Sequence, residues 1–481
     1  MSKEVFDYVV LGGGAAGCVM ANRLSQKGTV CLIEAGPDYG SLANNKWPSE
    51  MLDARDIPQT HPWQNTANGF PPERSRIIGG SSAENNTFAT WGSPSDYDLW
   101  EQYASGWNWQ SFSPYIVRAK EMMKVRHWQG HEKGFFAKAF GHALVDANYC
   151  QWADFNDDPN HHTVDFPPVN RIGQIRFNAA FAYLDPIREK SNFTLIDSAI
   201  IDRIIFNSNR AKSVEYIREG KRFNLEAKNF VLTSGAYGTP LILLRSGIGS
   251  QKKLKPHSIK VLHEINEVGT GLMDHPSAGI TIMPTQELIT ETLKSHRAGT
   301  LSTCQLIGRT STVHSSSQEW DTHLIPLAIH LGSEQFLFKV IADIMVTYSR
   351  GDVSITGSDP ELAPDIRAAY LSDNEGKDML CMRESLDMIK KVLLSESMKP
   401  LVKSLAPENL NSINLKNVHS GYHLAGTCRM GKVGESVVDY RGLVHGLENV
   451  YIADASIMPD LPKANTHMTT LAIAERLVNI W

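Results

Sequence analysis

The residues whose types could carry chemistry gather at the two ends of the chain. Near the C-terminus lie His423, in the string YHLAGTCRMG, and the pair Asn465 and His467, in ANTHMTT. Near the N-terminus, the string GGGAAG from Gly12 to Gly17 has the glycine spacing of a dinucleotide-binding turn. A histidine, with an unperturbed pKa of about 6.5, can take a hydroxyl proton near neutral pH. A bound dinucleotide can take a hydride, so the two ends together predict a redox enzyme that oxidises an alcohol.

The residues on both sides of the glycine turn predict the strands and the helix that position it. The β-branched run Tyr8–Leu11 predicts a strand, Ala15–Leu24 has helical periodicity, and Val30–Ile33 predicts a second strand. Strand, glycine-rich turn, helix and strand in this order open a Rossmann unit. Glu34 ends the second strand, where a carboxylate can accept hydrogen bonds from ribose hydroxyls.

Each glycine of the turn has its own part in this interpretation. Gly12 permits the turn, Gly14 lets a pyrophosphate approach the backbone, and Gly17 lets the helix pack against the strand. The N–H groups at the start of the helix then face the phosphate. The alternative is an ordinary glycine-rich turn, but the flanking strands and Glu34 favour dinucleotide binding.

Composition excludes several classes of function. The chain has 481 residues, 42% hydrophobic and 21% charged, with a net charge of -5, which is ordinary for a globular protein of about two domains. No basic stripe predicts nucleic-acid binding. The six cysteines form no CxxC pair, so neither a zinc site nor a disulfide framework is expected, and a reducing, cytoplasmic location is the default. The most apolar late stretch, Phe336–Tyr348, contains Lys339 and Asp343 and is too short to span a membrane.

The middle of the chain alternates between patterns. Strand-like runs at Leu195–Ile205 and Phe230–Thr233 continue the nucleotide-type region. Residues from about 121 to 184 and from about 285 to 415 differ in character, although His323–Leu331 and Ile344–Tyr348 predict strands within the second stretch. The nucleotide-type segments are therefore interleaved with two insertions, which indicates discontinuous domains.

With these motifs in place, the chain resembles the glucose–methanol–choline (GMC) oxidoreductases, FAD-dependent alcohol oxidases and dehydrogenases, and among them the choline dehydrogenase-like members. Five ordered strings carry the resemblance nearly from end to end. They are GGGAAG with Glu34, RIIGGSSAEN from Arg76 to Asn85, GAYGTPLILLRSGIG from Gly235 to Gly249, VGTGLMDHP from Val268 to Pro276, and the group YHLAGTCRMG, YIADAS and ANTHMTTLAIAER.

The resemblance implies an α/β chain, α+β overall. A Rossmann-like FAD-binding domain, residues 1–120, 185–285 and 418–481, would be interleaved with a substrate-binding domain, residues 121–184 and 286–417, built on an antiparallel sheet with helices. FAD is the expected cofactor. Glu84 stands where some choline-oxidase-like members hold the histidine that bonds FAD, so we expect non-covalent FAD. Thr466 stands where many members have proline, which leaves the subfamily and the substrate open.

The resemblance also assigns roles at the C-terminal end. His423 matches the family's catalytic histidine and would take the hydroxyl proton. The second catalytic position, His or Asn in the family, has two candidates: counting back from Ala474-Glu475 favours Asn465, and His467 is the second candidate. Asn465 would hold the alcohol oxygen, and His467 would then contact the cofactor.

The resemblance also implies a set of residues that contact the flavin nucleotide. They are Gly12, Gly14, Ala15, Ala16, Gly17, Glu34, Ala35, Gly79, Gly80, Ser82, Asn85, Ile201, Asp454, Ala455, Thr466, His467 and Met468. Asp454 has a turn-capping alternative, Asn85 a plain loop alternative, and Asp274 and His275 are as readily structural as cofactor-contacting. Three aromatic residues, Phe88, Trp91 and Tyr422, are candidates for the substrate pocket, with core packing as the alternative. The scattered histidines show no ligand spacing, so no metal is expected.

The sequence therefore predicts an FAD-dependent oxidoreductase that converts a CH–OH group, favoured as a primary alcohol, to a carbonyl. Its partners would be a small alcohol and either molecular oxygen or another electron acceptor, with no nucleic acid and no membrane span. Alternatives are a sugar or aminosugar hydroxyl oxidase, other flavin chemistry of this family such as a lyase or photodecarboxylase, and a non-catalytic flavin-binding protein, against which His423 argues. An NAD(P)-dependent dehydrogenase would share only the N-terminal turn. The alcohol, the oligomeric state and the physiological acceptor stay open.

Overall fold

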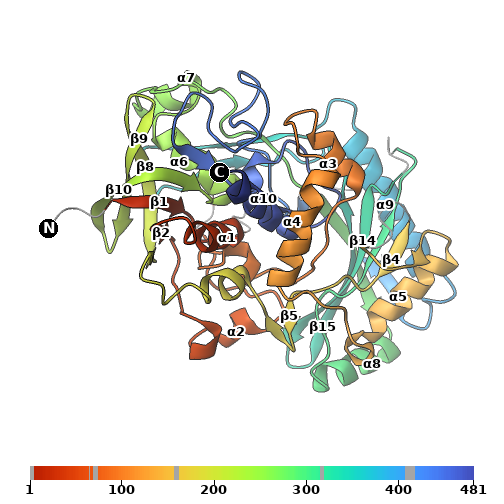
Figure 1. Ribbon diagram of the computed structural model, residues 1–481. Coiled ribbons are helices and arrows are strands. Elements are labelled where there is room, and N and C mark those ends of the chain that lie inside the picture. The colour runs from red at the N-terminus through yellow and green to blue at the C-terminus, as the bar shows by residue number, and fades with distance from the viewer. Residues whose placement is uncertain (1–4, 64–65, 69–73, 157–161, 315–318, 407–417) are drawn as a thin grey trace.

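A computed structural model describes residues 5–63, 66–68, 74–156, 162–314, 319–406 and 418–481 of the chain. Two large sheets dominate it and lie on opposite sides of the molecule (Figure 1). The first helix, α1 (Ala15–Leu24), and the C-terminal helix, α10 (Thr466–Ile480), pack against each other beside the first sheet (Figure 1). The sequence pattern at the two ends is thus brought into one region of the fold.

The first sheet is built around the N-terminal strand. Its order is β7 (Phe193–Ile196), β2 (Val30–Ile33), β1 (Phe6–Leu11), β10 (Lys221–Leu232), β9 (Arg210–Arg218) and β8 (Ala199–Asn207), with β20 (Val450–Ile452) also pairing with β10. β1 runs parallel to β2 and β10, whereas β9 pairs antiparallel with both β10 and β8. Parallel strands covered on both faces are apolar throughout, as the fully buried β2 shows.

Helices cover this sheet and close the nucleotide-type region. α1 (Ala15–Leu24) follows β1 directly and packs against α10 (Thr466–Ile480), which in turn packs against α4 (Trp109–Met122). α6 (Gly235–Arg245) follows β10, and α3 (Pro94–Trp100) precedes α4 with a capping box at Ser93 and Asp96. The predicted β1, α1 and β2 are confirmed, with α1 and β2 matching residue for residue.

The second sheet is antiparallel along its length. Its order is β18 (Val402–Ala406), β12 (Pro276–Pro284), β15 (Gln335–Ile344), β14 (Thr322–Gly332), β13 (Ile307–Thr310), β4 (Thr163–Asp165) and β3 (Gln151–Trp152), and β19 (His419–Ser420) pairs with β12. Only the short β3–β4 pair is parallel. α5 (Phe135–Asp146), α8 (Gln286–Arg297) and α9 (Lys377–Leu393) lie along one side of this sheet (Figure 1).

Several small elements complete the fold. They are α2 (Ser49–Leu52), α7 (Gln251–Leu254), the sheet of β11 (Thr270–Leu272), β16 (Gly351–Ser354) and β17 (Asp365–Arg367), and the hairpin of β5 (Arg171–Ile172) and β6 (Ile175–Arg176). Within the described residues no helix is both long and apolar enough to cross a membrane.

Buried apolar side chains form one hydrophobic cluster for each sheet. The first cluster gathers residues from both ends of the chain and also the segment Phe177–Ile187, whose N-terminal part was assigned to the substrate-binding domain. The second holds the apolar side chains of β12, β14 and β15 with those of α5 and α9. The α/β class is confirmed, while the division into domains stays a prediction.

One predicted strand, Ile344–Tyr348, is wrong. The strand ends at Ile344, because the next backbone N–H groups bond elsewhere: that of Met345 to the Asp321 carbonyl, and that of Tyr348 to the Asp378 carboxylate at the start of α9. The run Leu195–Ile205 is likewise two strands, β7 and β8, separated by a turn.

Candidate active site

The glycine turn is shaped by backbone packing. Gly12 has a φ of +112°, which favours glycine, and a Cβ added at Gly17 would lie 1.9 Å from the Gly12 carbonyl oxygen. At Gly14 a Cβ would meet nothing nearer than the Thr233 carbonyl oxygen, at 3.9 Å, and α1 begins at the next residue, Ala15. The turn is therefore tight at Gly17 and open at Gly14, where the helix N-terminus can receive an anion.

A second glycine loop lies directly on this turn. The N–H of Gly79 donates to the Gly13 carbonyl at 2.7 Å, and a Cβ at Gly80 would lie 2.9 Å from the Gly14 Cα. The buried Ser82 hydroxyl donates to the Gly79 carbonyl at 2.6 Å and accepts from the Ala179 N–H at 3.0 Å. The two strings GGGAAG and RIIGGSSAEN thus form one backbone surface.

The carboxylates predicted to contact the nucleotide are already engaged by the chain. Both oxygens of Glu34 accept backbone N–H bonds, from Gly13 and Gly36 at 2.7 Å each, and burial raises its pKa to about 7. Asp454 accepts from the N–H groups of Ser456 and Gly235, at 2.8 Å each. It also accepts from the Thr239 hydroxyl at 2.6 Å, so it caps the start of α6 and of the 3-10 turn Ala455–Ile457. Glu34 and Asp454 therefore fix the loops around the turn.

The other predicted contacts of the nucleotide are placed by the loops and strands that carry them. The Asn85 side chain accepts from the Thr87 N–H at 2.9 Å, a local loop bond. The Ala35 carbonyl accepts from Arg76 at 3.0 Å. Ile201 lies in β8, where its carbonyl accepts from Arg245 at 3.1 Å.

Two side chains from distant segments meet at His423. Its Nδ1 lies 2.8 Å from Nδ1 of His275, and its Nε2 lies 2.9 Å from Nδ2 of Asn465. The Asn465 oxygen accepts from the Thr90 hydroxyl at 2.8 Å, which turns the amide N–H towards His423. The Nε2 lone pair of His423 then accepts this amide N–H, and His423 carries its proton on Nδ1, from which it donates to Nδ1 of His275. These residues are called the histidine cluster: His275, His423, Asn465 and Thr90.

The Asp274 carboxylate fixes the backbone that carries His275 and His423. One carboxylate oxygen accepts from the backbone N–H groups of His275 and His423, at 2.8 and 2.9 Å. The other accepts from the hydroxyls of Ser420 and Tyr370, at 2.5 and 2.6 Å. Burial raises the pKa of Asp274 to about 6 in spite of these four bonds. One carboxyl group therefore links β12, β19 and the loop after β17 to the backbone on both sides of the histidine pair.

Burial controls the charge of the histidines. It lowers the pKa of His423 to about 4, and it lowers that of His275 well below the usual value, with His423 adding to the effect. His467, in the first turn of α10 between the buried Thr466 and Met468, also has its pKa lowered to about 4 by burial. Its Nε2 is buried and meets no hydrogen-bond partner among the described residues. Both His423 and His467 are thus neutral at pH 7.

The predicted pocket aromatics do not share one environment. Phe88 is buried within the hydrophobic cluster of the second sheet. Trp91 is half-buried, with the Lys120 ammonium over its ring at 5.9 Å. Tyr422 is 60% exposed with a φ of +67°, an uncommon conformation for a bulky residue. Phe88 and Trp91 flank Thr90 in the sequence, and Tyr422 precedes His423, so all three border the histidine cluster along the chain.

Sequence reasoning missed part of this arrangement. Thr90, Tyr370 and Ser420 carry no motif that marks them, and Asp274 and His275 were left open between structure and function. The adjacent letters D and H in VGTGLMDHP were the available signal, because a buried carboxylate beside a histidine commonly orients it. Within the described residues no group of three or more His, Cys, Asp or Glu side chains could hold a metal ion.

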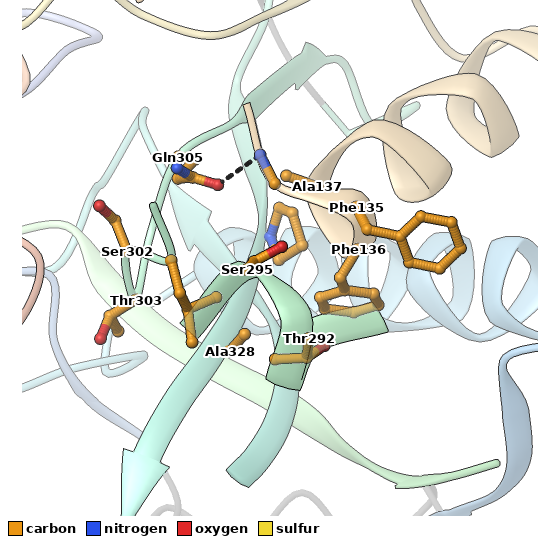
Figure 2. A pocket seen from close by; sticks show the side chains of 12 residues that line it. Phe135, Phe136, Ala137, Thr292, Ser295, Ser302, Thr303, Gln305 and Ala328 are labelled. Atoms are coloured by element: carbon orange, nitrogen blue, oxygen red, sulfur yellow. Dashed lines mark hydrogen bonds between the residues drawn. The ribbon is translucent and has the colours of Figure 1, made fainter. Parts of the chain in front are cut away.

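A pocket elsewhere in the molecule lies apart from this site. Figure 2 shows it among α5, α8 and β14, where the Gln305 side chain accepts from the Gly134 N–H at 2.8 Å. Its lining includes Phe136, Thr292 and Ala328 and none of the residues predicted for catalysis or cofactor binding. It is a feature of the packing between α5 and α8.

Comparison with known proteins places the chain among enzymes. Two models described as GMC oxidoreductase match residues 6–277 and 347–474. The chain is 29% identical to a 5-(hydroxymethyl)furfural oxidase of Methylovorus sp. (strain MP688), over 100% of this chain and 99% of that protein. It is 28% identical to choline oxidase of Arthrobacter globiformis, over 100% and 95%.

Solved structures agree on the fold. Pyridoxine 4-oxidase, named in its description as from Mesorbium loti, superposes with a TM-score of 0.83 at 22% identity, covering 99% of both chains. Formate oxidase of Aspergillus oryzae superposes with a TM-score of 0.85 at 20% identity, covering 100% of this chain and 98% of that one. The fold of this chain is therefore that of these two enzymes.

Proposed function

Since the chain belongs to the GMC oxidoreductase family of FAD-dependent enzymes, we propose that it oxidises the CH–OH group of a small primary alcohol to a carbonyl at His423. The observation that carries the proposal is the Nε2 lone pair of His423. The His423 imidazole is buried and neutral, its Nδ1 is bonded to a second imidazole, and its Nε2 accepts the Asn465 amide N–H, which the substrate hydroxyl would replace. A neutral imidazole in a fixed orientation is suited to take a hydroxyl proton.

The residues present fit FAD. The open position at Gly14 leaves room for a pyrophosphate at the start of α1, and the second glycine loop lies beside it. The orphaned Nε2 of His467 is a buried polar atom of the kind that a bound molecule would satisfy. FAD, when bound, supplies the acceptor of the alcohol's hydride.

The FAD is held without a covalent bond in this proposal. Glu84, at the position where some relatives carry a linking histidine, is bonded to the Ser75 hydroxyl, and burial raises its pKa. A carboxyl group there cannot form a histidyl link. Acid precipitation should therefore release the flavin into the supernatant, and flavin that stays with the precipitate would contradict this part of the proposal.

Asn465 and His467 are the two candidates for the second catalytic residue, and the proposal gives them different tasks. Asn465 donates to His423, so it orients the base, and its amide can also hold the alcohol oxygen when substrate is present. His467 keeps a free Nε2 in the first turn of α10 and would contact the cofactor. The alternative assignment gives His467 the contact with the alcohol oxygen and leaves Asn465 as a positioning residue.

One experiment tests the function. Purified protein, saturated with FAD, is mixed with a panel of primary alcohols under anaerobic conditions while the flavin absorbance is followed. The same alcohols are then tested for oxygen consumption and for reduction of an artificial dye, which separates an oxidase from a dehydrogenase. Bleaching by at least one alcohol supports the proposal; flavin that no alcohol bleaches, in protein that retains FAD, would overturn it.

A further inference from the structure

A row of polar side chains crosses the second sheet. Strand pairing places Ser277 of β12 opposite Asp343 of β15, and Asp343 opposite His323 of β14. His323 in turn lies opposite Arg309 of β13. Directly opposed residues of antiparallel strands project from the same face, so these four residues, called the polar row, share one face. All are buried, none more than 4% exposed.

The polar row faces away from the helices that cover this sheet. The next residues along the strands, Ala278, Ala342 and Leu324, belong to the apolar cluster that α5 and α9 complete. Side chains alternate between faces along a strand, so the row points to the opposite face. In Figure 1 that face is directed towards the half of the molecule that contains α10.

That opposite face lies beside the histidine cluster at one end of the row and is linked at the other end to the segment that precedes Asn465. Ser277 follows His275 by two residues in the same strand region, and His275 and His423 are among the groups that lower the pKa of His323. At the other end, the Arg309 guanidinium lies over the Trp320 ring at 4.2 Å. The Trp320 N–H donates to the Lys463 carbonyl at 3.0 Å, two residues before Asn465.

Buried atoms of three residues of the row, Oδ1 of Asp343, Nε2 of His323 and Oγ of Ser277, form no hydrogen bond within the described residues. A buried polar atom left without a partner is destabilising, and such atoms on one face beside the histidine cluster are the kind that a bound molecule would satisfy. Burial also raises the pKa of Asp343 to about 7, with the Ser277 hydroxyl opposing the effect.

We propose that the polar row recognises the substrate, and that the substrate is a primary alcohol carrying at least one further hydroxyl or carbonyl oxygen. This proposal rests on the proposed oxidation at His423. A second hydroxyl of the substrate donates to Oδ1 of Asp343, and Nε2 of His323 bonds to an oxygen of the same molecule. An alcohol without the second oxygen leaves both atoms unpaired, and sites built in this way discriminate strongly against such analogues.

Matched pairs of alcohols test the proposal. Each positional isomer of benzenedimethanol is compared with the corresponding methylbenzyl alcohol, which has the same ring and lacks one hydroxyl. We expect the wild-type holoenzyme to prefer the diol of at least one pair by about tenfold or more in kcat/KM, the effect of one hydrogen bond to a buried group. His323→Leu and Asp343→Leu should abolish this preference, while Asp343→Asn, which keeps an acceptor oxygen, should retain part of it.

A stability measurement separates recognition from a structural role. Because Nε2 of His323 has no hydrogen bond to lose, His323→Leu should unfold at the wild-type temperature or above it. Asp343→Leu also loses the interaction of its carboxyl group with the Ser277 hydroxyl, so its unfolding temperature is compared with that of Ser277→Ala. Thr322→Val is the matched control: Thr322 is buried in the same strand as His323, but its hydroxyl accepts from Ser385 of α9. That variant should be destabilised and keep the preference for the diol.

The outcomes distinguish this inference from the proposed function. Flavin that no alcohol reduces overturns the proposed function, and the inference falls with it. A wild-type enzyme that oxidises both members of every pair equally well overturns the polar row alone. Leucine variants that unfold like the Thr322→Val control, or that slow both alcohols by the same factor, also overturn it, because they show a structural role.

Discussion

The glycine turn and the histidine cluster are made of different kinds of atom. The turn is a backbone surface of consecutive residues, in which Gly17 must have no side chain and Gly14 leaves space in front of α1. The histidine cluster is made of side chains from separate segments, since His275, His423 and Asn465 meet only through the fold. A local string of letters specifies the first, whereas the second exists only when both halves of the molecule are assembled.

Substitutions in the two regions should therefore damage the enzyme in two different ways. A change in the turn acts by steric exclusion and should remove the cofactor. A change in the histidine cluster alters hydrogen bonding and protonation, so it should slow the reaction while the cofactor stays bound. The variants below test that separation, beginning with the largest expected effect.

His423→Ala should slow reduction of the flavin by an active alcohol by about 100-fold to 10,000-fold, the usual cost of removing a general base. FAD should stay bound at the wild-type ratio, because His423 contacts His275 and Asn465 rather than the glycine turn. Rapid anaerobic mixing measures the rate, and absorbance of the purified protein measures the flavin content. His445→Ala, a half-buried histidine bonded to Ser436, is the matched control and should reduce its flavin at the wild-type rate. If the His423→Ala variant reduced its flavin at the wild-type rate, His423 would not be the general base.

Asn465→Ala and His467→Ala should differ in what they damage. Asn465→Ala removes the amide that orients Nε2 of His423, so flavin reduction should slow by about 10-fold to 100-fold with FAD retained. His467→Ala should slow reduction less and should weaken FAD retention. Asn465→His should keep more activity than Asn465→Ala, because an imidazole can still hold the alcohol oxygen. The reverse order of the two alanine variants would assign the second catalytic role to His467.

The sequence predicted the backbone site better than the side-chain site. β1, the glycine turn, α1 and β2 follow from local periodicity and turn chemistry, and all were placed correctly. His423 and Asn465 were predicted only through the resemblance of their strings. The tautomer set by Thr90, and the four bonds of Asp274, depend on contacts between residues far apart in the chain. Periodicity within one segment does not show which strand lies opposite another. The polar row depends on that pairing, so the sequence alone did not predict it.

Gly14→Val and Gly17→Val should separate cofactor binding from folding. A Cβ added at Gly14 meets no protein atom nearer than 3.9 Å, so that variant should fold normally and hold FAD at least about tenfold more weakly. A side chain at Gly17 would collide with the Gly12 carbonyl oxygen, so that variant should lose stability by about 1–3 kcal/mol or more. Flavin content and thermal unfolding are measured on both variants.

Gly130→Val is the control for these glycines, because its added Cβ would meet nothing within 4 Å. It should match the wild type in both flavin content and unfolding temperature. Full flavin occupancy in a folded Gly14→Val protein would show that this turn is not the phosphate site.

The smallest expected effect concerns pH. Burial lowers the pKa of His423 to about 4, below its ordinary value of about 6.5, so the base stays neutral well into the acid range. The rate of flavin reduction at low alcohol concentration should change by less than about twofold between pH 8 and pH 5.5, and should fall about tenfold per unit only below pH 4.

The stability that the buried neutral His423 and His467 contribute is fully present above their unfolded pKa and is lost as pH falls through about 4. Brief pH jumps are therefore needed for the acid points. The charged or titratable neighbours are His275 and His323, whose own pKa values are depressed, and Asp274, which accepts the backbone N–H of His423 and has a pKa of about 6. A break near pH 6 that persists in Asp274→Asn would mean that water reaches His423, and the cluster would then lack the burial from which its chemistry was inferred.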